Sequence, residues 1–362
     1  MKTQKTWEQE QIDRYIKLGE GFSSKLIIIL VANVNGKTSD YDDYKNSSVL
    51  SEYYTLNEFE TLSTTYQKLG YEVLSFFNET DFMAAVLKKE IQTGDKEMLV
   101  INSAQTGTYT GRKSLIPAFC EHFKIMHTGS NPYVVSLCRD KFHSNTIVNN
   151  YLDNPLETYL YSGSSGWTGN RKPSNGTNVI AKLNGESASI GLNSKNIFIY
   201  TDDSEKYLSQ LSNQYMQPII VQPFISGYEI ELPIVIADES FPLSAIGIKM
   251  NGSEMLGNRF LDYNARFYHT YDFYNFDKLS PKVSNKIKID AVKVANVLGI
   301  SGYGRIDFRI TPSGSYYISD IATNPHITAD SSYAFAFHEL GYSYKDMLAT
   351  QIGSVLTKYT PS

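Results

Sequence analysis

Two stretches near the end of the chain decide its fold: Gly304–Ile310, which reads GRIDFRI, and Tyr316–His326, which reads YYISDIATNPH. Both are rich in aromatic and β-branched residues, as strands are, and the TPSGS segment between them is typical of a tight turn. Each stretch carries one aspartate, Asp307 and Asp320. Alone, two such acids are more often surface residues than a site. On paired strands they fit a Mg²⁺ site, because Mg²⁺ binds through one or two carboxylates plus phosphate oxygens.

The composition predicts a globular protein with two or three compact domains. The chain has 362 residues, of which 41% are hydrophobic and 20% are charged, so a packed core is expected and disorder is not. The net charge of −5 lacks the basic excess that is usual for nucleic-acid binding. We therefore expect no nucleic-acid partner.

The chain is expected to be cytoplasmic and to make no contact with a membrane. The apolar run Leu26–Val34 is too short to span a bilayer. The polar N-terminus, MKTQKTWEQEQ, lacks the apolar region of a signal peptide. Cys120 and Cys138 lie in neither a CxxC nor a zinc-like pattern, and we interpret both as buried thiols in a reducing compartment.

The first third of the chain predicts a parallel α/β sheet. Strands at 26–33, 71–76 and 97–102 alternate with helices at 56–69 and 81–88. This β-α-β-α-β order is typical of a parallel sheet with helices on its faces.

The pattern changes near Asn131, after which a lid-like module and then a mixed α+β region are expected. The stretch NVIAKLNGESASIGL at 178–192 predicts a strand, a glycine-containing turn and a second strand. Later strands are mostly antiparallel, with helices at 285–298 and 343–356. The predicted fold class therefore combines α/β and α+β parts in three domains, namely an N-terminal α/β domain at 1–130, a central lid at 131–225 and a C-terminal mixed domain at 226–362.

The turn after Lys182 suggests a phosphate-binding element. The small residues of NGESASIG, at 184–191, allow backbone N–H groups to approach a ligand beside the lysine charge. The segment is not a P-loop, because GxxxxGK[ST] is absent. The alternative is a surface hairpin with a solvated lysine, and this stretch alone favours that alternative.

The stretch Val221–Glu231, VQPFISGYEIE, could bind a nucleoside. Phe224 could stack on a purine and Glu229 could accept from ribose hydroxyls, although a simple crossover between strands would also explain the pattern. Arg305 shares a strand face with Asp307 and could stabilise a developing negative charge. Neither an HExxH zinc pattern nor a GxSxG nucleophile elbow is present.

Five stretches, taken in order, resemble the ATP-grasp superfamily and, within it, the D-alanine–D-alanine ligases. The resemblance runs from about residue 26 to the C-terminal helix and is strongest from residue 125 onward. Each stretch alone is a weak signal, whereas five in the same order are fairly specific. The resemblance implies a three-domain ATP-grasp fold that uses ATP with Mg²⁺ or Mn²⁺. The five stretches are IMHTGSNPYVVSLCRDK (125–141), VIAKLNGESASIG (179–191), VQPFISGYEIE (221–231), LDYNARF (261–267) and GYGRIDFRI with YYISDIATNPHITADSS (302–310 and 316–332).

The resemblance implies a nucleotide site. Lys141 and Lys182 would bind the ATP phosphates, and the 184–191 loop would close on them. The side-chain oxygen of Gln222, which replaces a family glutamate, would accept from the adenine amino group, and Glu229 would hold the ribose. The residues expected to contact the nucleotide are Lys141, Lys182, Glu186, Ser189, Gln222, Phe224, Ile225 and Glu229.

The resemblance also implies which residues surround the γ-phosphate, the metal and the substrates. Arg266, which replaces a family lysine, would reach the γ-phosphate, and Arg305 would stabilise the acyl phosphate and the tetrahedral oxyanion. The expected metal ligands are Asp307, Asp320 and Asn324, and the expected substrate residues are Ser331, at the acceptor carboxylate, and His326.

Several positions depart from the family pattern. Where the family metal strand has Glu and then Asn, this chain has Asp320 and Ala322, so water or Asn324 would have to replace one ligand. The remaining departures are Ala188 for a serine, Phe267 for a tyrosine, His326 for a glycine, and NSAQTGTYTGRKS (102–114) for the HG…GEDG signature. Because those family positions help to recognise D-alanine, we predict that the chain is not a cell-wall D-alanine–D-alanine ligase.

The predicted function is an ADP-forming ligase that joins a small-molecule carboxylate to an amine, drawn from amino acids or small peptides, through an acyl phosphate. One alternative is a catalytically impaired ATP-grasp protein that binds nucleotide as a sensor or scaffold, which Asp320 and Ala322 suggest. Another is a binding module for a ligand that is not a nucleotide. A homodimer formed through the N-terminal domain is a further expectation from the resemblance.

Overall fold

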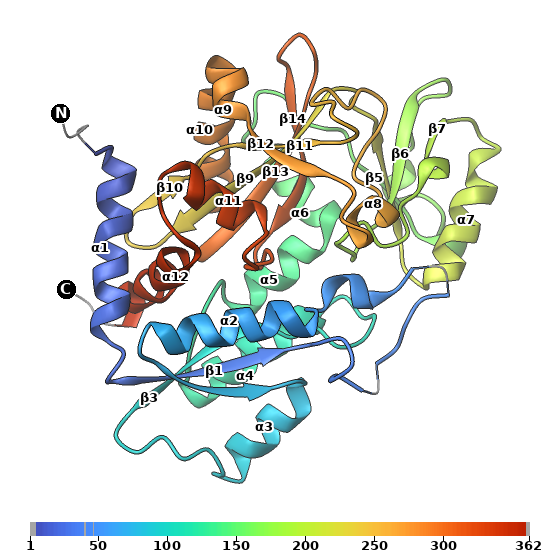
Figure 1. The fold of residues 1–362 in the computed structure, drawn as a ribbon. Coiled ribbons are helices and arrows are strands. Elements are labelled where there is room, and N and C mark those ends of the chain that lie inside the picture. Colours follow the sequence, from blue (N-terminus) through green and yellow to red (C-terminus); the bar gives the residue numbers. More distant parts are fainter. Residues whose placement is uncertain (1–4, 40, 46, 360–362) are drawn as a thin grey trace.

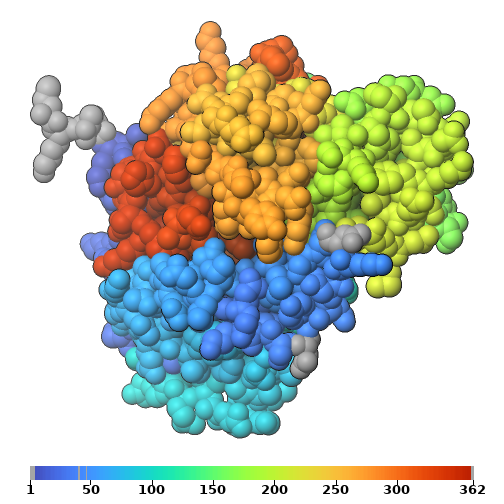
Figure 2. Space-filling view, turned by 45° about the vertical axis from the view of Figure 1, so that its right-hand side comes forward, coloured from blue at the N-terminus to red at the C-terminus, as the bar shows by residue number. Residues whose placement is uncertain are grey.

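Three β-sheets organise the protein in the computed structural model, which describes residues 5–39, 41–45 and 47–359. Figure 1 shows the N-terminal sheet lying below the C-terminal sheet, with the central sheet to one side. In the space-filling view the blue and cyan N-terminal residues, the green and yellow-green central residues and the orange and red C-terminal residues form three masses in contact (Figure 2). The predicted combination of α/β and α+β parts is confirmed.

The N-terminal sheet is parallel, in the order β2-β1-β3-β4. All seven residues of its central strand β1 are buried, because both faces of the sheet are covered. Ile28 and Leu30 belong to one hydrophobic cluster, and Ile27 and Ile29 to another. The elements are β1 (Leu26–Ala32), a 3₁₀ turn (Val49–Glu52), α2 (Leu56–Lys68), β2 (Glu72–Phe76), α3 (Glu79–Leu87), β3 (Glu97–Ser103), a 3₁₀ turn (Arg112–Ser114), α4 (Leu115–Phe123) and β4 (Met126–His127).

The central sheet is antiparallel, in the order β5-β8-β6-β7, and α7 packs against it. The elements are β5 (Tyr159–Tyr161), 3₁₀ turns (Gly163–Ser165, Thr168–Asn170, Ser194–Asn196), β6 (Asn178–Leu183), β7 (Ile197–Ile199), α7 (Ser204–Tyr215) and β8 (Ile219–Pro223).

The hairpin predicted at 178–192 is wrong in its second half. Strand β6 ends at Leu183, and the next strand begins only at Ile197. In the intervening loop Ala188 and Ser189 have φ values of 50° and 56°, in the left-handed region that strands do not use. The loop is instead held by side-chain contacts with distant parts of the chain, which local sequence does not reveal.

The C-terminal sheet carries the two acid strands, β13 and β14, in the antiparallel order β12-β11-β9-β13-β14 with β10 beside β9. One face packs on α10 through Ile230 and Phe308. The other face contributes Val235 and Tyr303 to the core that contains α11 and α12. The elements are β9 (Tyr228–Ile236), β10 (Ser240–Pro242), β11 (Ile246–Lys249), α8 (Tyr263–Phe267), β12 (Asp272–Asn275), α9 (Phe276–Leu279), α10 (Pro281–Leu298), β13 (Gly302–Ile310), β14 (Tyr316–Ala322), α11 (Ser332–Glu339) and α12 (Tyr344–Tyr359).

Helix α1 (Trp7–Gly21), which was not predicted, packs along α12 (Figure 1). Glycines permit this close approach, because a Cβ atom at Gly353 would collide with the Tyr15 carbonyl oxygen and one at Gly19 with the Ala349 carbonyl oxygen. The first helix is therefore fixed to the last one. None of the described helices is long and apolar enough to cross a bilayer.

Helices α5 (Pro132–Arg139) and α6 (Lys141–Val148) pack on the C-terminal sheet. Val134, Cys138 and Val148 share a hydrophobic cluster with β9, β13 and α10, although the sequence places them in the central domain. The predicted domain boundaries are not tested by this packing and stay a prediction. Cys120 and Cys138 are free and buried, as predicted.

Candidate active site

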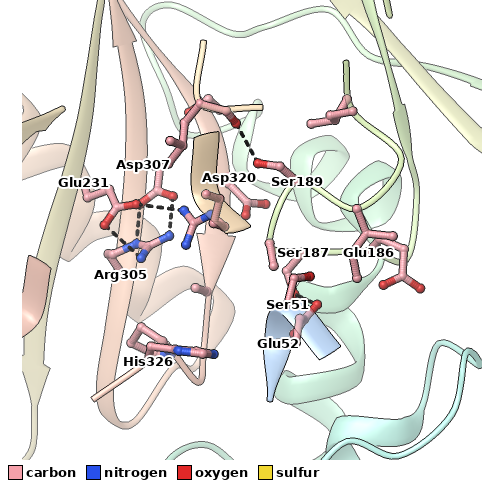
Figure 3. Close-up of a pocket in the computed structure, with 18 of the residues that line it drawn as sticks. Ser51, Glu52, Glu186, Ser187, Ser189, Glu231, Arg305, Asp307, Asp320 and His326 are labelled. Carbon is pink, nitrogen blue, oxygen red and sulfur yellow. Dashed lines mark hydrogen bonds and ion pairs between the residues drawn. The ribbon is translucent and has the colours of Figure 1, made fainter. Parts of the chain in front are cut away.

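A cavity of about 420 Å³ lies between the three sheets. In Figure 3 the C-terminal sheet forms one wall, and the 184–191 loop and the N-terminal region face it. Every residue predicted to bind nucleotide, metal or substrate lines this cavity: Lys141, Lys182, Glu186, Ser189, Gln222, Phe224, Ile225, Glu229, Arg266, Arg305, Asp307, Asp320, Asn324, His326 and Ser331. The structure thus brings the predicted residues together, while the role of each stays a prediction.

Gln222 on β8 offers an unused hydrogen-bond acceptor to the cavity. Its Nε2 donates to Thr158 Oγ1 at 2.9 Å, and its Oε1 is buried with no hydrogen-bond partner among the described residues. Leaving a buried acceptor unpaired costs about 1–3 kcal/mol. A ligand N–H, such as that of an adenine amino group, fits this position. Phe224 and Ile225 follow directly and line the same cavity.

Glu229, at the start of β9, is oriented by Arg309. Arg309 Nη1 donates to Glu229 Oε2 at 3.0 Å, and its guanidinium carbon lies 5.3 Å from the centre of the Phe224 ring. The Leu261 backbone N–H donates to the same Oε2 at 3.1 Å. Because these contacts use Oε2, the ribose contact predicted for Glu229 would fall to Oε1.

Lys141 and Lys182 lie together beside Asp320. Lys141 forms an ion pair with Asp320, and Lys182 Nζ donates to the Ser319 carbonyl oxygen at 3.2 Å. Burial and, second, the charge of Lys141 lower the pKa of Lys182 to about 8. Burial opposes ionisation of Asp320, but Lys141 and Lys182 outweigh it and bring its pKa to about 2. Two cations and one anion leave a positive charge that suits phosphate oxygens.

The 184–191 loop is held by a buried charge cluster, here called the clasp, formed by Glu52, Arg112, Lys113, Arg139 and Glu186. Arg112 contacts both Glu186 oxygens, at 3.0 and 2.7 Å. Arg139 lies 3.1 Å from Glu186 and 3.2 Å from Glu52, and Lys113 lies 2.8 Å from Glu52. Burial raises the pKa of Glu186, but Arg139 and Arg112 outweigh it and hold that pKa below its usual value. The clasp therefore joins the loop to the N-terminal region through ionised groups.

Two serines add further contacts to the same loop. Ser187 Oγ donates to Glu52 Oε1 at 2.6 Å, and Ser189 Oγ donates to the Leu261 carbonyl oxygen at 2.7 Å. The left-handed backbone of Ala188 and Ser189 is strained for residues other than glycine, and such strain is concentrated at functional sites. The loop thus keeps an unfavourable conformation that its contacts enforce.

Three carboxylates lie in register on adjacent strands of the C-terminal sheet. Glu231 on β9 is opposite Asp307 on β13, and Asp307 is opposite Asp320 on β14. Arg305 Nε and Nη2 donate to Asp307 at 2.7 and 2.8 Å, and Arg305 Nη1 lies 2.9 Å from Glu231 Oε2. Figure 3 shows this group projecting from the sheet into the cavity. Asp307 and Asp320 are therefore neighbours, as the predicted pairing of their strands implied.

Asp307 and Asp320 could bind a divalent cation whose remaining ligands are not protein side chains. Among residues 5–39, 41–45 and 47–359, no group of three or more His, Cys, Asp or Glu side chains is arranged to hold a metal. A cation here would need phosphate oxygens or water as well, which is the usual environment of Mg²⁺. Burial raises the pKa of Asp307 to about 7 against the opposing charge of Arg305. A cation would favour its ionised form.

Both polar atoms of the Asn324 side chain already make hydrogen bonds within the protein. Its Oδ1 accepts from the Tyr303 hydroxyl at 2.6 Å, and its Nδ2 donates to the Asn102 carbonyl oxygen at 3.0 Å. The metal contact predicted for Asn324 would have to use the second lone pair of Oδ1.

Arg266, His326 and Ser331 line the cavity on the substrate side. Arg266 Nη2 lies 3.2 Å from Glu231 Oε1, and its Nε is buried without a partner among the described residues. Burial, followed by the charge of Lys113, lowers the pKa of His326. Ser331 caps α11, because its Oγ accepts from the Ala334 N–H at 3.2 Å. Because no described residue accepts from Arg266 Nε, this donor suits an anionic ligand atom.

Sequence reasoning missed several charged residues that line or support the cavity. Glu52 comes from a segment with no recognised motif, Lys113 from the 102–114 stretch that departs from the family signature, and Arg139 from the 125–141 stretch, in which only Lys141 was singled out. Glu231 had a signal, because it lies two residues after Glu229 and therefore on the same strand face.

The structure first shows the fold, which is the ATP-grasp fold. Solved structures with this fold include a D-alanine–D-alanine ligase from Bacillus anthracis complexed with ATP, with a TM-score of 0.67, 16% identity and coverage of 92% of this chain and 98% of that one. The VanG D-Ala:D-Ser ligase from Enterococcus faecalis has a TM-score of 0.62 and 15% identity, and the match covers 91% of this chain and 99% of that one. The predicted three-domain ATP-grasp fold class is confirmed.

Sequence comparison then identifies the family. The family model described as D-ala D-ala ligase C-terminus matches residues 164–353, and this chain belongs to that family. The D-alanine–D-alanine ligase of Thermotoga petrophila is 24% identical over 311 residues, which cover 84% of this chain and 93% of the relative. That of Aquifex aeolicus is 23% identical over 300 residues, which cover 82% and 93%. The predicted class, an ADP-forming carboxylate–amine ligase, is confirmed at this level.

Proposed function

We propose that this chain uses ATP, with Mg²⁺ or Mn²⁺, to join the carboxylate of one amino acid or small peptide to the amine of another. The observation that carries the proposal is one cavity lined by Gln222, whose Oε1 has no partner among the described residues, by the cationic pair Lys141 and Lys182, and by the carboxylates Asp307 and Asp320. These groups match the base, the phosphates and the cation of a bound nucleotide.

The reaction has two balanced steps. A carboxylate oxygen of the donor attacks the γ-phosphorus, the bond to the β,γ-bridging oxygen breaks, and ADP leaves. The neutral amine of the acceptor then attacks the acyl carbon, phosphate leaves with the bonding electrons, and the nitrogen loses a proton. A cation at Asp307 and Asp320 would neutralise charge on the phosphate oxygens.

The side chains of the site would stabilise negative charge in the reaction and exclude water from it. Lys141 and Lys182 would hold phosphate oxygens, and Arg305 with Arg266 would stabilise the negative charge that develops at the phosphoryl group and the acyl oxygen. The loop held by the clasp would exclude water, which otherwise hydrolyses an acyl phosphate.

The proposed substrate pair differs from two D-alanines. His326 occupies the substrate side of the cavity with its ring 5.5 Å from that of Tyr54, and Lys113 is buried nearby in the clasp. His326 stands where the family pattern has a glycine, and Lys113 lies in the 102–114 stretch that replaces the family signature, so both support a donor or acceptor with a different side chain. Assembly as a homodimer is also part of this proposal.

The test is ADP release from magnesium–ATP against a matrix of amino acids, supplied singly and in pairs, with mass spectrometry of active wells. We expect ADP only with a particular pair, together with a product one water lighter than its reactants. Asp307→Asn and Lys182→Ala should both abolish the signal. If both variants turned over ATP like the wild type, the proposal would fail. Tight ATP binding with no turnover in any well would instead favour the impaired sensor suggested by Ala322.

A further inference from the structure

We propose that Glu231 is a positioning residue that holds both Arg266 and Arg305. Through this contact Arg305 would keep its place when Asp307 leaves it to bind a cation. The inference rests on the proposed function, because it concerns how the two arginines are held in that site. Glu231 was not among the residues that the sequence singled out.

The two oxygens of Glu231 are divided between the two arginines. Oε2 lies 2.9 Å from Arg305 Nη1, and Oε1 lies 3.2 Å from Arg266 Nη2. The Glu231 side chain is only 5% exposed. Burial raises its pKa, but Arg305 and Arg266 outweigh burial and hold that pKa below its usual value. One buried, ionised carboxylate is therefore shared by two guanidinium groups.

The guanidinium of Arg305 is divided in a complementary way. Its Nε–Nη2 edge binds Asp307 at 2.7 and 2.8 Å, and its Nη1 binds Glu231. If Asp307 turned to a cation, the Nε–Nη2 edge would lose its partner and the Nη1 contact would remain. That freed edge has the two parallel N–H groups that suit a carboxylate or phosphoryl oxygen pair.

The charges explain why an anchor is needed. Arg305 is largely buried and Arg266, with 25% of its side chain exposed, is partly buried beside Glu231 and Asp307. Without Glu231, Asp307 would be the remaining carboxylate bound to Arg305, and a buried charge without a partner is strongly unfavourable. Arg305 would then compete with a cation for Asp307. Glu231 thus makes Asp307 available without leaving Arg305 unpaired.

The test measures cation binding independently of turnover. Wild type and Glu231→Gln are titrated with Mg²⁺ at a fixed concentration of the non-hydrolysable analogue AMP-PNP, with heat as the readout. We expect the Mg²⁺ concentration for half-saturation to rise roughly tenfold in Glu231→Gln, the effect of strengthening one charged hydrogen bond that competes for Asp307. The affinity for AMP-PNP at saturating Mg²⁺ should change less than about threefold. The matched control is Glu239→Gln, an exposed residue beyond the end of the same strand, which should change neither value.

A double variant separates positioning from general damage. If Glu231 acts through Arg305, Glu231→Gln should shift the Mg²⁺ requirement less than about twofold in an Arg305→Ala background, because the competing group is gone. An equal shift in both backgrounds would overturn the inference. If Glu231→Gln does not fold, Glu231→Asp keeps the charge on a shorter side chain and should show a smaller shift that Arg305→Ala removes.

The outcomes distinguish this inference from the proposed function. Wild-type binding of AMP-PNP with an unchanged Mg²⁺ requirement in the Glu231 variants would overturn the role of Glu231 alone. No Mg²⁺-dependent AMP-PNP binding by the wild type would overturn both.

Discussion

Removing Glu186 should destabilise the protein more than removing Arg112, its closest partner in the clasp. The clasp has three cations and two carboxylates, all buried. Arg112→Gln leaves two charges of each sign, and Arg112 Nε is already without a partner among the described residues. Glu186→Gln instead leaves three cations around Glu52. The ranking follows from this difference in residual charge.

The magnitudes follow from burial. Breaking a buried pair and leaving uncompensated charge costs about 3–5 kcal/mol, which we expect for Glu186→Gln. Losing the hydrogen bonds of Arg112 while the remaining charges become balanced costs about 1–3 kcal/mol, which we expect for Arg112→Gln. The control is Glu72→Gln, from an exposed pair with Lys96 in which Glu72 is 58% exposed, and it should cost under about 1 kcal/mol. Urea unfolding at pH 7 measures all three.

The loss of unfolding free energy caused by Glu186→Gln, relative to the wild type, should become smaller when the pH is raised from 7 to 9. Burial lowers the pKa of Lys113 to about 8, against about 10.4 for an unfolded lysine. Between these values the unfolded chain binds more protons, so stability rises with pH. Loss of the Lys113 charge removes one of the three cations left by Glu186→Gln. An Arg112→Gln variant as unstable as Glu186→Gln, or a deficit that grows with pH, would refute the charge argument.

Three further predictions concern the nucleotide and the packing of the helices. Gln222→Leu removes the buried acceptor and should raise the KM for ATP about 5- to 100-fold, measured by ADP release, whereas an unchanged KM would argue against adenine at this position. Because the pKa of Lys182 is about 8, ATP affinity should fall as pH rises through that value, and a Lys182→Met variant should lose this pH dependence in calorimetry. Gly353→Ala places a Cβ against the Tyr15 carbonyl and should lower the free energy of unfolding by about 1–3 kcal/mol, with Gly21→Ala, where an added Cβ meets no other atom, as the comparison for glycine replacement.

The sequence predicted elements whose signals are local. The continuous apolar run of β1 and the alternating acid strands β13 and β14 formed where expected, and the turn between the acid strands set the pairing of Asp307 with Asp320. Helix α1 was missed because it is mostly polar, and its burial depends on the facing glycine of α12. Its partner lies more than 300 residues away in the chain, so no local pattern could reveal it.

The site divides in the same way. Lys182 and Glu229 were found because they stand in stretches with a recognisable order along the chain. The conformation of the 184–191 loop was not found, because it is imposed by Glu52 and Arg112 from a different sheet region. Glu231 was overlooked although it shares a strand face with Glu229, since its importance appears only when the register with Asp307 is known.

The central claim is that the donor carboxylate is activated as an acyl phosphate in this cavity. The most direct test uses the active donor found in the amino-acid matrix, labelled with ¹⁸O in its carboxylate, together with unlabelled ATP and the amine acceptor. Mass spectrometry of the inorganic phosphate should show one ¹⁸O atom transferred per product formed, with ADP as the nucleotide product. Phosphate without ¹⁸O, or AMP in place of ADP, would contradict the account.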